Sequence, residues 1–283
     1  MENQKIIIHK PEELSEKIRK IKDCGTDSLH VLSDFDRSFT KCFVDGKKFS
    51  TSWAQFRNLN ILGEDYLEKS SEMFEYYRPI EISTEINEEE KRSKLREWWE
   101  KHLSLLVEKG LSKKDIDFVV EKGGIRLRDD AKKILNFLKN KNIPLIFISS
   151  GIGNIISGTL SREGVLYDNI NIASNFFTFD DSGATSGFEG DMIINSQNKN
   201  EASLEKLAIF DKIKDRRNVI LIGDALEDLK MLGGIGYDTV ISIGFLNEDV
   251  ENSLENFKEN FDIVITGDGN MEYIIELLHK IGD

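Results

Sequence analysis

Six short apolar runs recur along the chain, and most are continuously apolar rather than alternating with polar residues. Continuous apolar runs are typical of strands that are buried on both faces of a parallel sheet. Strands that alternate with helices predict a doubly wound α/β fold, in which ligands bind outside the carboxyl ends of the strands. The predicted strands are residues 28–35, 143–151, 169–175, 218–225, 239–245 and 262–268. Helical patterns separate most of them, most clearly over residues 128–142, 201–215 and 225–234.

A long segment from about residue 50 to residue 125 interrupts this alternation. It is helical in character, mixes acidic with basic residues and is rich in aromatic side chains. The pattern predicts an α/β core domain of residues 1–48 and 126–283, with an inserted α-helical cap domain of residues 49–125. A second irregular stretch, residues 176–195, has the Gly and Asp spacing of a β-hairpin.

Charge and composition limit the classes of partner. The 283 residues include 38 Lys and Arg against 51 Asp and Glu, which gives a net charge of −13. An acidic surface repels phosphate backbones, so we expect neither a nucleic-acid polymer nor an anionic membrane as partner. Cys24 and Cys42 have no metal-like spacing, and the apolar run near the N-terminus has three residues, too few for a signal peptide. We expect a cytoplasmic, monomeric protein.

Polar side chains cluster at the ends of three predicted strands and ahead of one helix. They are Asp34 and Asp36, Ser149 and Ser150, Asp224 and Asp228, and Lys199. Each has an ordinary structural explanation when taken alone: Asp224 as a helix N-cap, for example, or Lys199 as a solvated surface residue. Several carboxylates at one edge of a sheet, however, need a counter-charge, and their hard oxygen ligands select Mg²⁺. The cluster therefore predicts a magnesium site.

Four segments resemble, in order and content, the motifs of the haloacid-dehalogenase (HAD) superfamily of phosphohydrolases, whose core is a Rossmann-like sheet. They are DFDRS (34–38), FISSG (147–151), NKNEAS (198–203) and GDALEDL (223–229). The chain also resembles the cytosolic 5′-nucleotidase III family of pyrimidine and 7-methylguanosine nucleotidases, in these segments and in YYRPIEI (76–82) and EWWEKHLSLLVEKG (97–110). This second resemblance runs from about residue 28 to near the C-terminus.

The resemblance implies a Mg²⁺-dependent 5′-nucleotidase that hydrolyses nucleoside 5′-monophosphates, such as CMP, UMP or 7-methyl-GMP, through an aspartyl-phosphate. Asp34 is then the nucleophile, and Asp36 is the acid that protonates the leaving 5′-oxygen and the base that activates water. The implied metal site consists of Asp34, the backbone carbonyl of Asp36 and Asp224, with Asp228 acting less directly.

The same resemblance assigns the phosphate site. Ser149, the N–H groups around Ser150 and Gly151, and Lys199 are expected to bind the phosphate oxygens. Ser38 matches the small hydroxyl position of the first motif and is expected to form a structural hydrogen bond in the loop.

The base site is expected in the cap. By resemblance, Glu81 faces the Watson–Crick edge of the base, Trp99 stacks on it, and Trp53 forms the opposing wall, whereas Trp98 is assigned to the core. His102 stands where vertebrate relatives carry a serine that touches substrate, and Trp53 stands near a histidine in them. Two tryptophans and a glutamate suit a cationic base such as 7-methylguanine. The pyrimidine nucleotides stay open beside it.

Three other functions remain open at this point. One is a HAD phosphatase for another small phosphate ester, such as a sugar phosphate. Another is a non-catalytic, receiver-like phosphoacceptor module, which needs neither a cap of this size nor Asp36 as an acid–base group. The third is net phosphotransfer to a nucleoside acceptor from the same aspartyl-phosphate.

Overall fold

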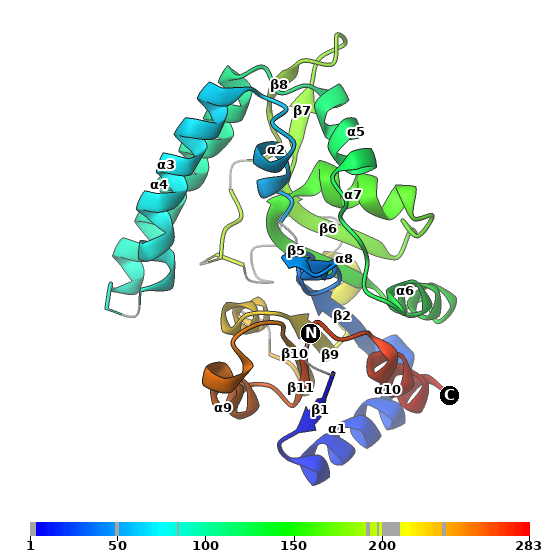
Figure 1. The fold of residues 1–283 in the computed structure, drawn as a ribbon. Helices are drawn as coiled ribbons and strands as arrows, with labels where there is room; N and C mark the ends of the chain where they lie inside the picture. The colour runs from blue at the N-terminus through cyan, green and yellow to red at the C-terminus, as the bar shows by residue number, and fades with distance from the viewer. Residues whose placement is uncertain are drawn as a thin grey trace.

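The core of the protein is a seven-stranded sheet (Figure 1). The computed structural model describes residues 4–48, 51–83, 85–190, 193–196, 198–199, 210–233 and 236–283. The strands of the sheet are β1 (Ile6–Ile8), β2 (Leu29–Ser33), β5 (Leu145–Ile152), β6 (Ile170–Asn175), β9 (Asn218–Gly223), β10 (Thr239–Leu246) and β11 (Ile263–Thr266). Their order is β1-β11-β10-β9-β2-β5-β6, and every pairing is parallel except that of β1 with β11. The chain runs outward in both directions from β2, so the switch point lies between β2 and β9.

All six predicted strands are present, and the predicted α/β class is confirmed. The sequence interpretation missed the edge strand β1 and the helix α1 (Pro11–Cys24) that follows it. The run of three isoleucines pairs with Ile263, Val264 and Ile265, and so extends the sheet at an edge where a short strand suffices.

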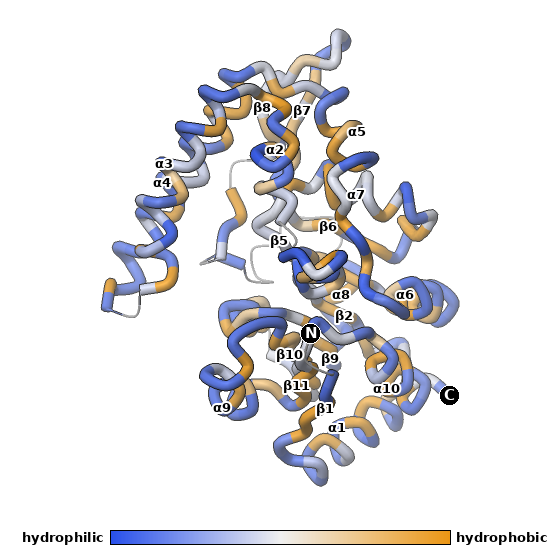
Figure 2. The backbone as a smooth tube through the Cα atoms, viewed as in Figure 1, coloured by the Kyte–Doolittle hydropathy of each residue, from blue (hydrophilic) through white to orange (hydrophobic). Residues whose placement is uncertain are grey.

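Helices cover both faces of the sheet, because successive strand residues point to opposite sides. In β9, Ile220 and Ile222 join the apolar cluster under α1, α6 and α10, whereas Val219 and Leu221 join the cluster under α9. Figure 2 shows the apolar strands between helices whose outer faces are polar. The core helices are α6 (Ala131–Asn140), α7 (Gly153–Arg162), α8 (Phe210–Ile213), α9 (Val250–Asn260) and α10 (Glu272–Gly282), with 3₁₀ turns η1 (Thr26–Ser28) and η3 (Leu226–Leu232).

The predicted helices have different outcomes. The prediction over residues 128–142 is confirmed by α6, and that over 225–234 corresponds to the 3₁₀ turn η3 rather than to an α-helix. The prediction over 201–215 lies outside the described residues up to residue 209, and α8 is the described part of it.

Four further helices lie between β4 and β5 in the chain, and we call them the helical insertion. They are α2 (Ala54–Asn58), α3 (Glu64–Ile82), α4 (Glu88–Glu108) and α5 (Lys113–Lys122). The α3–α4 pair forms a hairpin that extends away from the sheet (Figure 1). Trp98 packs between Tyr77 and Trp99 inside this hairpin, at ring-centroid distances of 5.6 and 5.3 Å. The predicted boundary at residue 49 lies outside the described residues.

Two small hairpins complete the fold. The predicted hairpin over 176–195 is confirmed by β7 (Phe177–Phe179) and β8 (Thr185–Phe188). The other hairpin, β3 (Phe43–Val44) with β4 (Lys47–Lys48), leads into the helical insertion. In the described part of the chain, no helix is both long and apolar enough to cross a membrane.

Candidate active site

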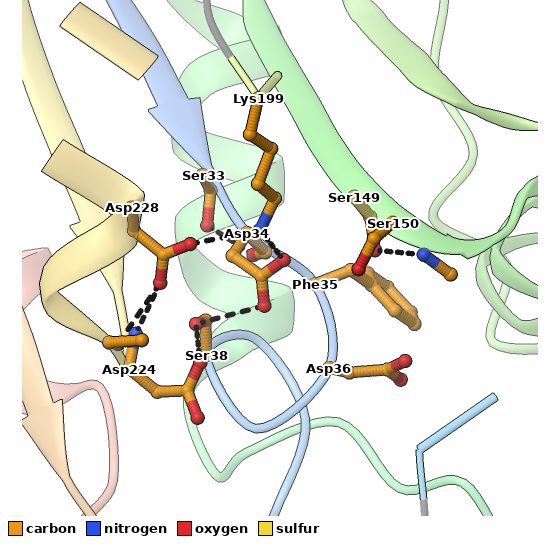
Figure 3. Close-up of polar contacts among 12 residues, drawn as sticks. Ser33, Asp34, Phe35, Asp36, Ser38, Ser149, Ser150, Lys199, Asp224 and Asp228 are labelled. Carbon is orange, nitrogen blue, oxygen red and sulfur yellow. Dashed lines mark hydrogen bonds and ion pairs between the residues drawn. The ribbon is translucent and has the colours of Figure 1, made fainter. Parts of the chain in front are cut away.

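The motif residues meet at the carboxyl ends of the central strands. Asp34 directly follows β2, and Asp224 directly follows β9. The two strands pair in parallel, and the Asp34 N–H donates a hydrogen bond to the carbonyl of Ile222 at 2.9 Å. Parallel pairing in this register brings both carboxylates to the same edge of the sheet, where they converge with Lys199 (Figure 3).

One buried ammonium joins the carboxylates. The Lys199 Nζ donates to Oδ1 of Asp34 and, at 2.9 Å, to Oδ1 of Asp228. Asp34, Asp224 and Asp228 each present an oxygen within 4.8 Å of the others. The Ser38 hydroxyl donates to Asp34 at 3.3 Å and to Asp224 at 3.4 Å. The structure thus brings together the lysine, the serine and three of the four aspartates that the sequence singled out.

Burial sets the electrostatics of this cluster. It raises the pKa of Asp34 to about 7, although the adjacent Lys199 ammonium opposes the rise. Burial also raises the pKa of Asp224, and the neighbouring carboxylates of Asp228 and Asp34 add to that rise. The pKa of Lys199 is raised, because the carboxylates of Asp228 and Asp34 outweigh the opposing effect of burial. The three carboxylates that face this one ammonium offer oxygen ligands that fit a hard divalent cation. Such a cation would favour the ionised forms of the carboxylates.

Asp228 supports its neighbours. Its Oδ2 accepts hydrogen bonds from the backbone N–H groups of Asp224, at 2.9 Å, and Ala225, at 3.1 Å. Its Oδ1 accepts from Lys199. A Cβ on Gly223 would lie 2.5 Å from the Asp228 side chain, so this close approach needs glycine. Because both Asp228 oxygens already hold donors, Asp224 is better placed than Asp228 to bind a cation directly.

The carboxylate of Asp36 lies on the other side of Asp34 from Asp224 and Asp228 (Figure 3). Its Oδ2 accepts two hydrogen bonds from Ser52, one from the backbone N–H at 3.0 Å and one from the hydroxyl at 2.9 Å. Burial raises the pKa of Asp36, and the two Ser52 donors oppose the rise. The sequence interpretation missed Ser52, because a single serine carries no pattern.

The end of β5 forms the wall beside Asp36. The pairing of β5 with β6 shifts in register between Ile148 and Ile152, and we call the irregular stretch of Ser149, Ser150 and Gly151 within the end of β5 the β5 turn. The Gly151 N–H donates to the buried Ser149 hydroxyl at 3.1 Å. A Cβ on Gly151 would lie 2.5 Å from the Ser52 hydroxyl oxygen, so glycine lets this segment pack closely against Ser52, on the Asp36 side of the site.

Asn175 anchors the loop that carries Lys199. Its side chain accepts from the Ile194 N–H and donates to the Ile194 carbonyl, both at 2.9 Å. The same amide donates to the Ser150 carbonyl at 3.0 Å. One side chain, which the sequence interpretation also missed, thus ties the lysine loop to the β5 turn.

Three of the predicted base-site residues form one aromatic cluster. Trp53 lies 4.6 Å from Trp99 and 5.0 Å from His102, measured between ring centroids. His102 Nε2 is 3.0 Å from the Tyr66 hydroxyl, and burial lowers the pKa of His102 to about 3, so its ring is neutral. A base stacked between the two indoles needs a separation of about 7 Å, twice a van der Waals contact. Trp53 and Trp99 must therefore part before a base can lie between them.

Trp53 also contacts the β5 turn, because its indole N–H donates to the Ser150 carbonyl at 2.7 Å. Glu81, the fourth predicted base-site residue, lies elsewhere, at the end of α3. Its carboxylate accepts from Arg78 at 2.5 Å and from the Ser196 hydroxyl at 3.2 Å. Among the described residues, no hydrogen bond joins Glu81 to Trp53, Trp99 or His102. Glu81 instead connects the helical insertion to the lysine loop.

A buried arginine holds the turn after Asp36. The Arg128 guanidinium donates to the carbonyl of Ser38 at 2.8 Å and to that of Arg37. It also donates to Asp268 at 2.9 Å and to Asn247 at 2.7 Å. The sequence interpretation missed this arginine because its partners lie far away in the chain. Its donors fix the backbone that shapes the loop of Asp34 and Asp36.

Known proteins are similar to nearly the whole chain. The family model described as Pyrimidine 5′-nucleotidase (UMPH-1) matches residues 37–282. The 7-methylguanosine phosphate-specific 5′-nucleotidase A of Xenopus laevis is 34% identical over 272 residues, which cover 96% of this chain and 93% of that protein. The human 7-methylguanosine phosphate-specific 5′-nucleotidase is 32% identical over 277 residues, which cover 98% of this chain and 92% of that protein.

Solved structures agree with these matches. The crystal structure of cytosolic 5′-nucleotidase IIIB bound to cytidine has a TM-score of 0.88 and 30% identity, over 98% of this chain and 93% of that one. A HAD family hydrolase of Salmonella enterica, with a TM-score of 0.56 and 16% identity, covers 89% of this chain and 71% of its own length and shares the fold.

Proposed function

The chain belongs to the pyrimidine 5′-nucleotidase (UMPH-1) family, and from this membership we propose that it hydrolyses nucleoside 5′-monophosphates to a nucleoside and phosphate with the help of Mg²⁺. The reaction class, hydrolysis of a phosphoric monoester, is that of the family. The observation that carries the proposal is the buried cluster of Lys199 with Asp34, Asp224 and Asp228 beside the separate carboxylate of Asp36.

Asp34 acts as the nucleophile. One of its oxygens attacks phosphorus, the bond from phosphorus to the 5′-oxygen breaks, and Asp36 gives its proton to that oxygen. Water then attacks the aspartyl-phosphate while Asp36 takes a proton from it, which releases phosphate and restores Asp34. Lys199, Ser149 and the N–H groups of Ser150 and Gly151 hold the phosphate oxygens during both steps.

The metal site consists of Asp34, Asp224 and the backbone carbonyl of Asp36, with Asp228 supporting Asp224 and Lys199. When bound, Mg²⁺ neutralises charge on the transferring phosphoryl group. The Ser38 hydroxyl lies between Asp34 and Asp224 and holds the two carboxylates in position relative to each other.

The helical insertion serves as the cap of a core made of residues 1–48 and 126–283, and residues 49–125 supply the base site. Trp99 and Trp53 stack on the base, His102 lies behind Trp53, and Glu81 faces the polar edge of the base. Two indoles favour the cationic ring of 7-methylguanine, and the curated relatives named above are specific for 7-methylguanosine phosphate. The cytidine in the neighbouring crystal structure keeps CMP as the second substrate to test.

A substrate panel tests the reaction. Phosphate release is measured with Mg²⁺ from 7-methyl-GMP, CMP, UMP, AMP, GMP and several sugar phosphates. We expect selective turnover of 7-methyl-GMP or the pyrimidine nucleotides, complete loss of it in EDTA and recovery on adding Mg²⁺. Mg²⁺ should also raise the Tm of the resting protein, because it binds the folded state alone. Turnover confined to sugar phosphates would keep the mechanism and overturn the nucleotide assignment.

The base-site assignment has its own test. Glu81→Gln and Trp99→Ala are each expected to lower kcat/KM for the preferred nucleotide by about ten- to a hundredfold, since each removes a base contact worth about 1.5–3 kcal/mol. The exposed Glu75 lies on α3 as Glu81 does, so Glu75→Gln is a matched control and should leave kcat/KM unchanged. Unchanged kinetics in both base-site variants would indicate that the cap binds another small phosphate ester.

A further inference from the structure

Ser52 is the residue that connects Asp36 to the β5 turn. It is fully buried, and both of its donors, the backbone N–H and the hydroxyl, point to Oδ2 of Asp36. The hydroxyl oxygen in turn accepts the Ile152 N–H at 3.2 Å. Because a hydroxyl has one proton, and the Ile152 N–H occupies an acceptor position, that proton is directed at Asp36.

The two oxygens of Asp36 are therefore not equivalent. Oδ2 accepts two hydrogen bonds from Ser52, whereas Oδ1 accepts none among the described residues. An oxygen that already accepts two donors is a poor place for the acid proton, so the proton of the Asp36 carboxylic acid belongs on Oδ1.

The position of Ser52 along the chain adds to its importance. It lies where the chain enters the helical insertion, next to Trp53, whose indole donates to the Ser150 carbonyl. Ser52 and Trp53 together hold the start of the insertion against the end of β5, through the Ile152 N–H and the Ser150 carbonyl. Because Ser52 and Trp53 are adjacent in the chain, a movement of Trp53 away from Trp99 would also act on the residue that holds Asp36.

We propose that Ser52 is a positioning residue, which holds Oδ2 of Asp36 so that Oδ1 exchanges the proton with the leaving 5′-oxygen. This inference rests on the proposed nucleotidase function. In the first step the proton on Oδ1 moves to the 5′-oxygen as the phosphorus–oxygen bond breaks and the bond from phosphorus to Asp34 forms. In the second step Oδ1 takes a proton from the water that attacks the aspartyl-phosphate. Ser52 itself neither gains nor loses a proton.

Two kinds of leaving group test the assignment. An alkoxide needs a proton to depart, whereas a thiolate departs without one. The probes are 7-methyl-GMP, CMP and their 5′-S-phosphorothiolate analogues, in which sulfur replaces the bridging 5′-oxygen. Nucleoside release is followed in single turnovers of the full chain with Mg²⁺. For Ser52→Ala, we expect release from the oxygen substrate to slow by about ten- to a hundredfold, and release from the sulfur analogue to change by less than about threefold.

Matched variants separate this role from a structural one. Ser174 donates its hydroxyl to the Gly151 carbonyl at 2.9 Å without touching Asp36, so Ser174→Ala should treat both substrates as the wild type does. Ser52→Thr keeps the donor and should release nucleoside from the oxygen substrate at close to the wild-type rate. Ser52→Cys keeps the size with a weak donor, and should repeat the alanine result if the alanine variant does not fold.

Equal slowing of both substrates in Ser52→Ala and Ser52→Cys, or no slowing of either in these two variants, would overturn the assignment of Ser52. A wild-type chain that releases nucleoside from none of the oxygen substrates would instead overturn the proposed function, and the role of Ser52 with it. The two failures are thus distinguishable in one set of assays.

Discussion

Replacing Asp34 by Asn is expected to reduce nucleotide hydrolysis by at least about 10⁴-fold, as is typical when the nucleophile of a covalent mechanism is lost. The amide has nearly the same size, and its oxygen can still accept the hydrogen bond from Lys199. It cannot attack phosphorus, however, because the amide nitrogen and oxygen are poor nucleophiles. The variant also removes one buried negative charge from a crowded cluster, so we expect its fold to be at least as stable as that of the wild type.

The measurement that checks this expectation is covalent labelling. Wild-type protein quenched in acid during turnover of nucleotide carrying radioactive phosphate should retain label that hydroxylamine removes, and Asp34→Asn should retain none. Asp211 is exposed on α8, where it pairs with Lys214 rather than with a residue of the cluster. Asp211→Asn is therefore a suitable control and should keep both label and activity. Label that persisted in Asp34→Asn would place the nucleophile elsewhere, and Asp224 would be the next candidate.

The sequence could predict the sheet and the centre of the site for the same reason. Buried parallel strands need continuous apolar runs, and the carboxyl ends of such strands meet at one edge. Residues that end different strands, such as Asp34 and Asp224, therefore come together wherever the strands are adjacent. A four-residue strand can be recognised from its apolar run, as β11 was, whereas the three-residue edge strand β1 leaves too short a run to predict.

Residues that position the site could not be predicted in this way. Ser52 is 16 residues from Asp36, and Arg128 is 90 residues from Ser38. Neither contact leaves a period or a spacing in the sequence, because each depends on where the helical insertion leaves the core and returns to it. The two connections lie together: Lys41 N–H donates to the carbonyl of Arg126, and Arg128 N–H donates to that of Phe39, both at 2.9 Å. Tertiary contacts, rather than any sequence motif, bring Ser52 and Arg128 to the loop of Asp34 and Asp36.

The same limit applies to the base site. Trp53, Trp99 and His102 were predicted to form the base site, and the structure brings them into one cluster. Their mutual contact could not be predicted, since residue types do not show whether two aromatic rings touch each other or leave a gap. Glu81 was also predicted to contact the base, but in the structure its carboxylate accepts a hydrogen bond from Ser196, in the loop that carries Lys199. If a base stacks between Trp53 and Trp99 as proposed, the two rings have to move apart from their 4.6 Å contact.

Lys199→Met is expected to impair both stability and activity, because it removes the one ammonium that, among the described residues, contacts Asp34 and Asp228. Breaking a buried ion pair by deleting one partner leaves uncompensated charge and costs about 3–5 kcal/mol. We expect urea unfolding in EDTA to show a loss of this size. The loss should be smaller in saturating Mg²⁺, because the cation then supplies the missing positive charge and binds only the folded chain. The activity should fall by about 10³-fold even with Mg²⁺, since the residue proposed to bind the phosphate oxygens is lost.

The dependence of this loss on pH distinguishes charge from packing. Asp34 has a pKa of about 7 in the folded chain against 3.8 for an ordinary aspartate, so below pH 7 the folded state binds a proton that the unfolded state does not. The stability that this proton adds is complete below about pH 4 and is lost as the pH rises through 7. In Lys199→Met the pKa of Asp34 rises further, because the ammonium that lowered it is gone. In EDTA, the deficit relative to the wild type should therefore shrink as the pH falls from about 9 to 7, and change little from 7 to 4, where Asp34 is protonated in both folded chains.

Lys258→Met provides the matched control, because Lys258 pairs with Glu255 on the surface of α9 and lies outside the site. It should change the free energy of unfolding by less than about 1 kcal/mol at every pH. A deficit in Lys199→Met that stayed constant from about pH 9 to 7 would mean that the lysine acts through packing of its aliphatic chain. A deficit that fades as the pH falls from about 9 to 7, and again with Mg²⁺, would show that protons, the lysine and the divalent cation neutralise the same buried carboxylates. Two positive groups would then neutralise the carboxylates of the wild-type cluster. One is the lysine, which is always present, and the other is the cation, which completes the site for phosphoryl transfer.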